Sequence, residues 1–197
     1  MIKKTLLAVL FSGISFYGSA QSKIDPKTIK EKMQWFEDAK LGIFIHAGIY
    51  SVADVTESWS FHNGNISVED YMKQQKLFTL SNYDPAAWAQ MIKDCGARYA
   101  VITTKHHDGV AMYDTKLGKL SSVKTCPAKK DMIKPLFEEL RKRDVKCGAY
   151  FSLIDWTHND YPDFLKEKKR YDIKKEPARW ERFQKFFQGQ IKEISDW

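Results

Sequence analysis

Three short apolar runs in the sequence each end in side chains that can hydrogen-bond or stack. The runs are Leu41–Ile45, Tyr99–Thr104 and Cys147–Ser152. The residues that follow or close them are His46, His106-His107-Asp108 and Asp155-Trp156. In parallel α/β proteins the carboxyl ends of the strands face the ligand. We therefore expect these side chains to meet at one pocket.

The pocket has the composition of a carbohydrate site. Imidazole and carboxylate groups hydrogen-bond hydroxyls, and an aromatic side chain covers the C–H face of a sugar ring or a methyl group. Trp59 and Tyr113 lie on loops that we expect at the same face. The isolated His62 and His158 are interpreted as surface residues of loops.

The adjacent pair His106 and His107 is the strongest single signal. Neighbouring side chains on a strand point to opposite sides of the sheet. Either one imidazole lines the pocket while the other braces it, or a bulge turns both inward.

A metal centre is the first competing use of these histidines. His46, His106 and His107 could supply a three-histidine zinc site, but the adjacent pair is awkwardly spaced and no HxH or HExxH motif is present. The cysteines show no CxxC pair and are expected as buried, unpaired thiols, with one disulfide still open. The three are Cys95, Cys126 and Cys147. We expect no metal and no cofactor.

The apolar runs alternate with amphipathic helices. Asp84 fits a helix N-cap, Pro85 the first helical position and Gly96 the left-handed C-terminal position. The apolar stripe of this helix is Trp88, Met91, Ile92 and Cys95. Asp131 is expected to cap a second helix. Its buried face is Ile133, Leu136, Phe137 and Leu140, and a last helix carries Trp180, Phe183, Phe187, Ile191 and Ile194.

This alternation predicts parallel strands in an α/β fold. An open sheet that binds a dinucleotide would carry GxGxxG after a strand, and neither this motif nor GxxxxGK[ST] occurs. A (β/α)8 barrel is therefore favoured, with only its first three β/α units in this chain. Leu41–Ile45 is expected to be a strand buried on both faces.

The N-terminus predicts export. Lys3 and Lys4 precede an apolar run, and Gly18-Ser19-Ala20 is a small-x-small cleavage pattern. We expect a signal peptide over residues 1–20, cleavage near Ala20 and a secreted or periplasmic protein that leaves the membrane after cleavage. The net charge of +7 is spread over helix faces and Lys166–Arg170, which we interpret as solvated surface rather than a nucleic-acid patch.

Three blocks of this sequence resemble glycoside hydrolase family 29, the α-L-fucosidases. They are Trp35–His46, Tyr99–Gly109 and Gly148–Trp156, which cover most of residues 31–160. The resemblance implies a TIM-like barrel and an exo-acting, retaining hydrolase that releases L-fucose without cofactor or metal. Its partner would be a fucosylated glycan or glycoconjugate.

The resemblance also implies roles for individual residues. His46, His106 and His107 would bind fucose hydroxyls, while Trp59 and Tyr150 would border and line the pocket. Further candidates are Glu57, Asp155 and Trp156. The nucleophile and the acid/base are expected beyond Trp197, so no catalytic residue is assigned within the chain, and Asp108 and Asp155 are expected to support the site.

Two positions depart from the family pattern. Ala47 follows the first histidine where the family has Trp or Phe, and Ser58 precedes the pocket Trp59 where the family often has Glu. A shifted loop could bring Glu57 to that place. A sugar-binding protein without turnover remains the alternative, and a metal-dependent hydrolase is a third interpretation.

Overall fold

The computed structural model describes residues 25–197 except 54 and 167, and the chain divides between Glu37 and Asp38, so that the described residues 25–37 and 38–197 belong to two separate units. The first unit contains most of helix α1 (Pro26–Ala39), and all elements named below belong to the second. The expected signal peptide at residues 1–20 lies outside the described residues. No helix within the described ranges is both long and apolar enough to cross a bilayer.

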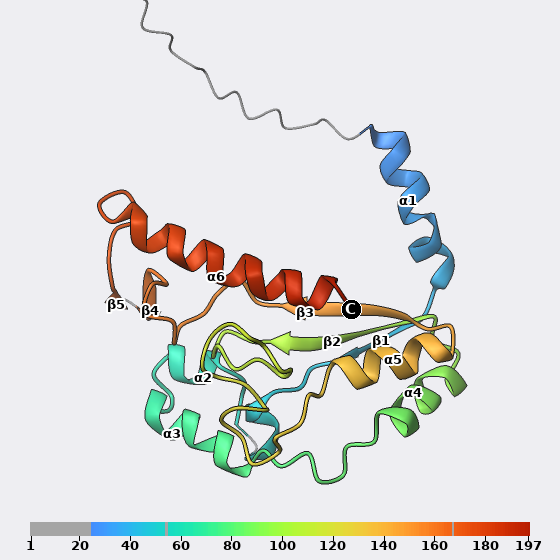
Figure 1. The fold of residues 1–197 in the computed structure, drawn as a ribbon, viewed down its shortest axis with the longest axis horizontal. Coiled ribbons are helices and arrows are strands. Elements are labelled where there is room, and N and C mark those ends of the chain that lie inside the picture. Colours follow the sequence, from blue (N-terminus) through green and yellow to red (C-terminus); the bar gives the residue numbers. More distant parts are fainter. Residues whose placement is uncertain (1–24, 54, 167) are drawn as a thin grey trace, which may run out of the picture. The chain divides into compact units, whose positions relative to one another are not determined.

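The second unit is built on a three-stranded parallel sheet in the order β1-β2-β3, seen edge-on in Figure 1. Strand β1 spans Gly42–Ile45, β2 Tyr99–Lys105 and β3 Lys146–Phe151. Gly42 pairs with Tyr99, and Tyr99 pairs with Lys146. The predicted strands and their parallel pairing are confirmed. The three strands form an open sheet among the described residues.

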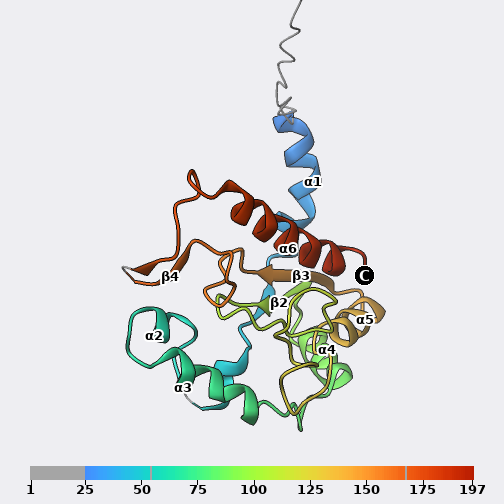
Figure 2. The ribbon, with the colours of Figure 1, turned by 60° about the vertical axis from the view of Figure 1, so that its left-hand side comes forward.

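Each crossover between these strands carries a helix. Helix α4 (Pro85–Asp94) lies between β1 and β2 in the sequence, and α5 (Lys134–Lys142) lies between β2 and β3. These two helices pack against each other. Helix α6 (Pro177–Ser195) follows β3 and runs along it in both Figure 1 and Figure 2.

The remaining elements are short. The connection from β1 to α4 contains η1 (Ile49–Val52), α2 (Trp59–His62), α3 (Val68–Lys73) and η2 (Gln74–Leu77). Strands β4 (Asp163–Leu165) and β5 (Lys168–Lys169) pair antiparallel between β3 and α6. The short helices place Trp59 and its neighbours beside the ends of the parallel strands.

Asp84 is the N-cap of α4 as expected, whereas the N-cap position of α5 is Ile133 and Asp131 binds the amides at the start of that helix from two residues earlier. Asp84 Oδ1 accepts hydrogen bonds from the amides of Ala86 and Ala87 at 2.9 and 3.0 Å. Asp131 Oδ1 accepts from Ile133 and Lys134 at 2.8 and 3.0 Å. Gly96 has a φ of 84°, which satisfies the left-handed position after α4.

The apolar stripe of α4 is narrower than expected. Ile92 is buried, together with Ala89, but Met91 is 64% exposed and Cys95 is exposed. Trp88 is half-buried and packs against the core, so the stripe prediction was wrong for Met91 and Cys95 only. The three cysteines are free, and Cys126 alone is buried while Cys147 is half-buried.

Strand β1 was wrongly expected to be buried on both faces. Phe44 is 54% exposed, and Gly42, Ile43 and Ile45 are only half-buried. The cause is its place at the edge of the sheet, where β2 is its one neighbouring strand among the described residues.

Tyr113 does not lie at the pocket face. It is fully buried, its hydroxyl donates to the carbonyl of Gln190 at 3.2 Å, and its ring meets Trp197 edge-on at 5.3 Å. The expectation for Tyr113 was therefore wrong. It belongs to the core beneath α6, because the loop after β2 turns inward rather than out to the strand ends.

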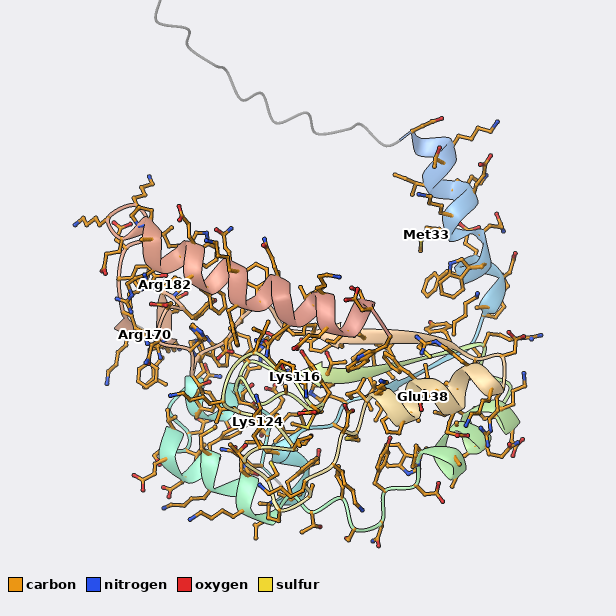
Figure 3. All side chains as sticks on the ribbon, viewed as in Figure 1. Met33, Lys116, Lys124, Glu138, Arg170 and Arg182 are labelled. Carbon is orange, nitrogen blue, oxygen red and sulfur yellow. The ribbon has the colours of Figure 1, made fainter. Side chains whose placement is uncertain are left out.

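The basic residues lie on several different elements. Figure 3 shows Lys116 and Lys124 on the β2–α5 connection, Arg170 directly after β5, and Arg182 on α6. Arg170 departs from the expected solvated surface, because it is half-buried and donates to the carbonyl of Trp156 at 2.7 Å. This residue ties the loop after β3 to its own β4–β5 hairpin.

Candidate functional site

Side chains from the ends of all three parallel strands come together in one aromatic cluster. The His46 and His106 rings lie 5.1 Å apart between centroids, and the His106 and His107 rings lie 4.2 Å apart. Tyr150 on β3 stacks on His106 at 5.9 Å and meets His46 edge-on at 6.4 Å. The structure thus gathers four of the sequence-predicted site residues.

The adjacent histidines share one cluster because the sheet is irregular just before them. The pairing of β2 with β3 shifts register between Thr103 and Lys105, so that three residues of β2 lie opposite Tyr150 and Phe151 of β3, as a bulge would place them. His106 faces His46 and Tyr150, whereas His107 faces Trp59 and Trp156. Of the two alternatives for this pair, the geometry agrees with the bulge.

Two tryptophans extend the cluster on the His107 side. Trp59 meets His107 edge-on at 5.5 Å and Trp156 at 4.9 Å. Trp156 is buried, but 41% of Trp59 is exposed. Trp59 therefore offers an accessible aromatic face beside the imidazoles, with Trp156 packed behind it.

Every imidazole of the cluster uses Nδ1 for a hydroxyl of the protein. His46 Nδ1 lies 3.2 Å from Thr103 Oγ1, and His106 Nδ1 lies 2.5 Å from Ser58 Oγ. His107 Nδ1 is hydrogen-bonded to Ser152 Oγ. The other ring nitrogen, Nε2, is then the atom left for a ligand.

Burial keeps the two adjacent histidines uncharged. It lowers the pKa of His106 from 6.5 to about 3, helped by the nearby imidazoles of His107 and His46. It lowers the pKa of His107 to about 4, helped by the charge of Lys105. A neutral imidazole has one donor and one acceptor, which suits a neutral hydroxyl better than an anion.

The carboxylates of the two aspartates next to the cluster, Asp155 and Asp108, already interact with other groups of the protein. Asp155 Oδ2 pairs with Lys105 Nζ at 3.1 Å, and the side chains are 3% and 0% exposed. Asp155 Oδ1 accepts from the amide and hydroxyl of Thr157 and from the amide of His158. This carboxylate braces the loop after β3 and has no free oxygen.

Asp108 is held in the same manner. Its carboxylate accepts from the hydroxyl of Tyr71 at 2.8 Å and the amide of Val110 at 2.9 Å. Burial raises the pKa of Asp108 from 3.8 to about 6. Like Asp155, it fixes the loop that carries the histidines.

Glu57 reaches the cluster although Ser58 separates it from Trp59. Its Oε2 lies 3.7 Å from His106 Nδ1 and accepts the amide of Trp59 at 2.9 Å. Ser58 is fully buried and uses its hydroxyl on His106. A carboxylate is therefore present beside His106, on the residue before Ser58.

Sequence reasoning misplaced two histidines. His62, expected at the surface, is half-buried and stacks on Trp156 at 3.9 Å with an interplanar angle of 9°. His158 is also half-buried and packs against Phe186 at 4.5 Å. The i, i+3 spacing of Trp59 and His62 on a helix places both on one face, and this signal would have found His62.

Sequence reasoning also missed the hydroxyl partners and Tyr50. The ring of Tyr50 lies 5.2 Å from His46 and 5.6 Å from His106.

Within the part of the chain that the structure describes, no group of three or more His, Cys, Asp or Glu side chains is arranged to hold a metal ion. The cluster thus combines three hydrogen-bonding imidazoles, two of them kept neutral by burial, with an aromatic wall.

Comparison with known proteins gives consistent matches. A family model described as Alpha-L-fucosidase matches residues 16–197. The tissue alpha-L-fucosidase of Bos taurus is 31% identical over 150 residues, and an alpha-L-fucosidase of Branchiostoma floridae is 32% identical over 154 residues. Each match covers 68% of this chain, but only 31% and 33% of the relative. The chain therefore spans about a third of the length of these relatives.

Solved structures of the same kind share the fold. Alpha-L-fucosidase isoenzyme 1 from Paenibacillus thiaminolyticus superposes with a TM-score of 0.71 at 34% identity, over 84% of this chain and 40% of that one. A GH29 alpha-L-fucosidase from Bacteroides thetaiotaomicron gives 0.72 at 29% identity, over 87% and 38%. With the family model matching nearly the whole sequence, this chain belongs to the alpha-L-fucosidase family, glycoside hydrolase family 29.

Proposed function

We propose that the protein is an exo-acting, retaining α-L-fucosidase and that this chain supplies the N-terminal part of its catalytic domain. The curated relatives and solved structures named above are all alpha-L-fucosidases. They extend well past the matched region, so the remaining strands of a (β/α)8 barrel and both catalytic carboxylates belong to a continuation of the chain. The substrate is a fucosylated glycan or glycoconjugate.

The observation that carries this proposal is the histidine cluster, with the neutral imidazoles of His106 and His107, beside the exposed indole of Trp59. A fucosyl unit offers several hydroxyls and a methyl group, but no charge. The uncharged imidazoles of His106 and His107, with His46 beside them, can exchange hydrogen bonds with sugar hydroxyls, and no ionic charge has to be desolvated at these two rings. Trp59, 41% exposed, covers an apolar face of the sugar.

These residues contribute by binding and orienting the sugar. A retaining glycosidase uses one carboxylate to attack the anomeric carbon and a second to protonate the leaving oxygen. Hydrogen bonds that strengthen as the oxocarbenium-like transition state forms lower the barrier, whereas uniform binding affects KM only. Asp108 and Asp155 take no part in the chemistry in this proposal, because their oxygens already hold Tyr71, Lys105 and backbone amides.

Histidine substitutions in the full-length protein test this function. His106→Ala and His107→Ala should each lower kcat/KM on an aryl α-L-fucoside by roughly 3-fold or more, since one hydrogen bond is lost and its partner is left unpaired. The matched control is His158→Ala, because His158 packs against Phe183 and Phe186 rather than the cluster. Its kcat/KM should stay within about 2-fold of wild type.

Two results would contradict the proposal. Unchanged kinetics in both cluster variants, with folding intact, would make His106 and His107 structural. Binding of fucose without any turnover in the full-length protein would favour the sugar-binding alternative.

Export is part of the same proposal. Residues 1–20 act as a signal peptide, which releases a secreted or periplasmic enzyme free of the membrane. N-terminal sequencing of exported protein should begin at or close to Gln21. Protein retained in the cytoplasm with Met1 intact would be incompatible with export.

A further inference from the structure

Ser152 connects His107 to the protein backbone. It directly follows β3, is 4% exposed, and its amide donates to the carbonyl of Lys105 at 3.0 Å. Its hydroxyl donates to the carbonyl of Ile154 at 2.9 Å and is hydrogen-bonded to His107 Nδ1. The hydroxyl therefore has two partners in a fixed position.

The direction of these two hydrogen bonds follows from counting protons. A serine hydroxyl has one proton, and a carbonyl oxygen can only accept. Because the proton goes to Ile154, the Ser152 oxygen must accept from His107, so the proton of the imidazole sits on Nδ1. In a neutral ring this leaves the lone pair on Nε2.

His46 repeats the arrangement with longer bonds. Its Nδ1 lies 3.2 Å from Thr103 Oγ1, which donates to the carbonyl of Ile45 at 3.4 Å. His106 differs, because its hydroxyl partner Ser58 has no second hydrogen bond in the described structure that uses its proton. Ser58 can donate or accept, so it does not fix the tautomer of His106.

We propose that Ser152 is a positioning residue that holds His107 in the Nδ1–H tautomer, so that Nε2 accepts a hydrogen bond from a ligand hydroxyl. The identity of that ligand as a fucoside rests on the proposed function, whereas the tautomer does not. The low pKa of His107, about 4, keeps the ring neutral and preserves the Nε2 lone pair at neutral pH. Ser152 thereby makes His107 Nε2 a hydrogen-bond acceptor rather than a donor toward the ligand.

The tautomer is measured directly by NMR. Full-length protein with ¹⁵N-labelled histidine is recorded at neutral pH, and His107→Gln assigns the signals of His107. Wild type should show a protonated Nδ1 and a lone-pair Nε2 at His107. Ser152→Ala should move the population toward Nε2–H, and Ser152→Thr, which keeps the hydroxyl, should restore the wild-type pattern. A wild type in the Nε2–H form, or a tautomer unchanged in Ser152→Ala, would overturn the proposal.

Kinetics test whether the tautomer acts on substrate. Ser152→Ala should lower kcat/KM on an aryl α-L-fucoside roughly 3- to 10-fold, and Ser152→Thr should recover most of it. In a His107→Ala background the same substitution should have no further effect, because Ser152 acts through that ring. Additive effects of the two substitutions would show a merely structural serine.

Ser122→Ala is the matched control. Ser122 is fully buried and its hydroxyl donates to the carbonyl of Lys130 at 2.8 Å, and it has no hydrogen bond to an imidazole among the described residues. This variant should lose stability and keep wild-type kinetics. If the wild-type protein turns over no fucoside at all, the proposed function fails while the NMR measurement still decides the tautomer.

Discussion

At the strand ends, the protonation state of each side chain determines which interactions it can make. His106 and His107 are bases kept neutral by burial, while Lys105, directly before them, forms a buried ion pair with Asp155. The structure thus contains a neutral layer, His106 and His107, and a charged layer, Lys105 and Asp155. Substitutions in the two layers should have different effects.

The neutral histidines predict a loss of stability in acid. Between pH 6.5 and about 4 the unfolded chain binds protons at His106 and His107 that the folded protein does not, so lowering the pH reduces the free energy of unfolding. Asp108, with its pKa raised to about 6, opposes this, because the folded state binds its proton first. Comparing variants therefore isolates the histidine contribution.

His107→Gln should reduce the stability lost between pH 7 and pH 4.5 by about 1 kcal/mol or more. Urea unfolding of the full-length protein at both pH values measures this difference. Glu69→Gln is the control, since the Glu69 side chain is 85% exposed, and it should leave the pH dependence unchanged. An equal loss in wild type and His107→Gln would show that His107 titrates normally.

The charged layer predicts a large effect at Asp155. Asp155→Asn leaves Lys105 buried without its counter-ion, which should cost about 3–5 kcal/mol of unfolding free energy. Asp114→Asn is the matched control, because the Lys116–Asp114 pair is 76% and 45% exposed, and it should cost less than about 1 kcal/mol. Denaturant titrations of the two variants would rank them, and similar losses would contradict a buried ion pair.

The sequence was sufficient to locate the imidazoles but not their partners. His46, His106 and His107 follow apolar runs, which is a local pattern. Ser152 is separated from His107 by 45 positions and Ser58 from His106 by 48, so nothing short of the folded chain pairs them. A hydroxyl has no sequence signature as an imidazole partner.

At the scale of the elements, the connections that follow the strands carry more of the site residues than the strands themselves. The three strands and the helix caps could be predicted because apolar runs and capping side chains act over a few residues. Burial of β1 and of the outer side of α4 could not, because both depend on what packs against them. The bulge before His106 was only one of two alternatives until the register was known.

Gly109, in the connection after β2, allows a test of how these connections affect the site. It has a φ of 76°, and a Cβ added there would lie 2.6 Å from Asp155 Oδ1 and press on Thr157 Oγ1. Gly109→Ala should cost roughly 2–5 kcal/mol of unfolding free energy, because left-handed strain and overpacking add. It should also lower kcat/KM, because Asp155 must move.

The variant Gly64→Ala distinguishes backbone strain from overpacking, the two causes of destabilisation expected for Gly109→Ala. Its φ is 82°, but a Cβ there meets nothing within 4 Å. Gly64→Ala should therefore cost about 1 kcal/mol from backbone strain alone and leave kinetics unchanged. Equal destabilisation in thermal melts of the two variants would show that the contact with Asp155 does not matter.

At the scale of the whole molecule, the described chain presents open sheet edges. Strands β1 and β3 each pair only with β2 among the described residues, and Phe44 on β1 is 54% exposed. A closed barrel removes such edges. The free energy of unfolding of a complete domain is only ~5–15 kcal/mol. Whether the domain folds therefore depends on the elements that pack against these open surfaces.

Residues 21–197 expressed alone should therefore neither release fucose nor unfold cooperatively. The measurements are a fucose-release assay and calorimetry, with the full-length protein as control. A sharp transition together with fucose binding would contradict this expectation and support the sugar-binding alternative. Turnover abolished by Asp155→Ala would place the chemistry on a residue that we regard as structural.

The half-exposed indole of Trp59 also has an optical consequence. Its ring touches His107 and Trp156, and 41% of it meets water. A sugar that covers this ring would exclude water and shift its fluorescence emission to shorter wavelength, while the buried Trp156 would change little. The difference spectrum between the protein and Trp59→Phe would therefore report, without a label, whether a sugar covers the indole of Trp59.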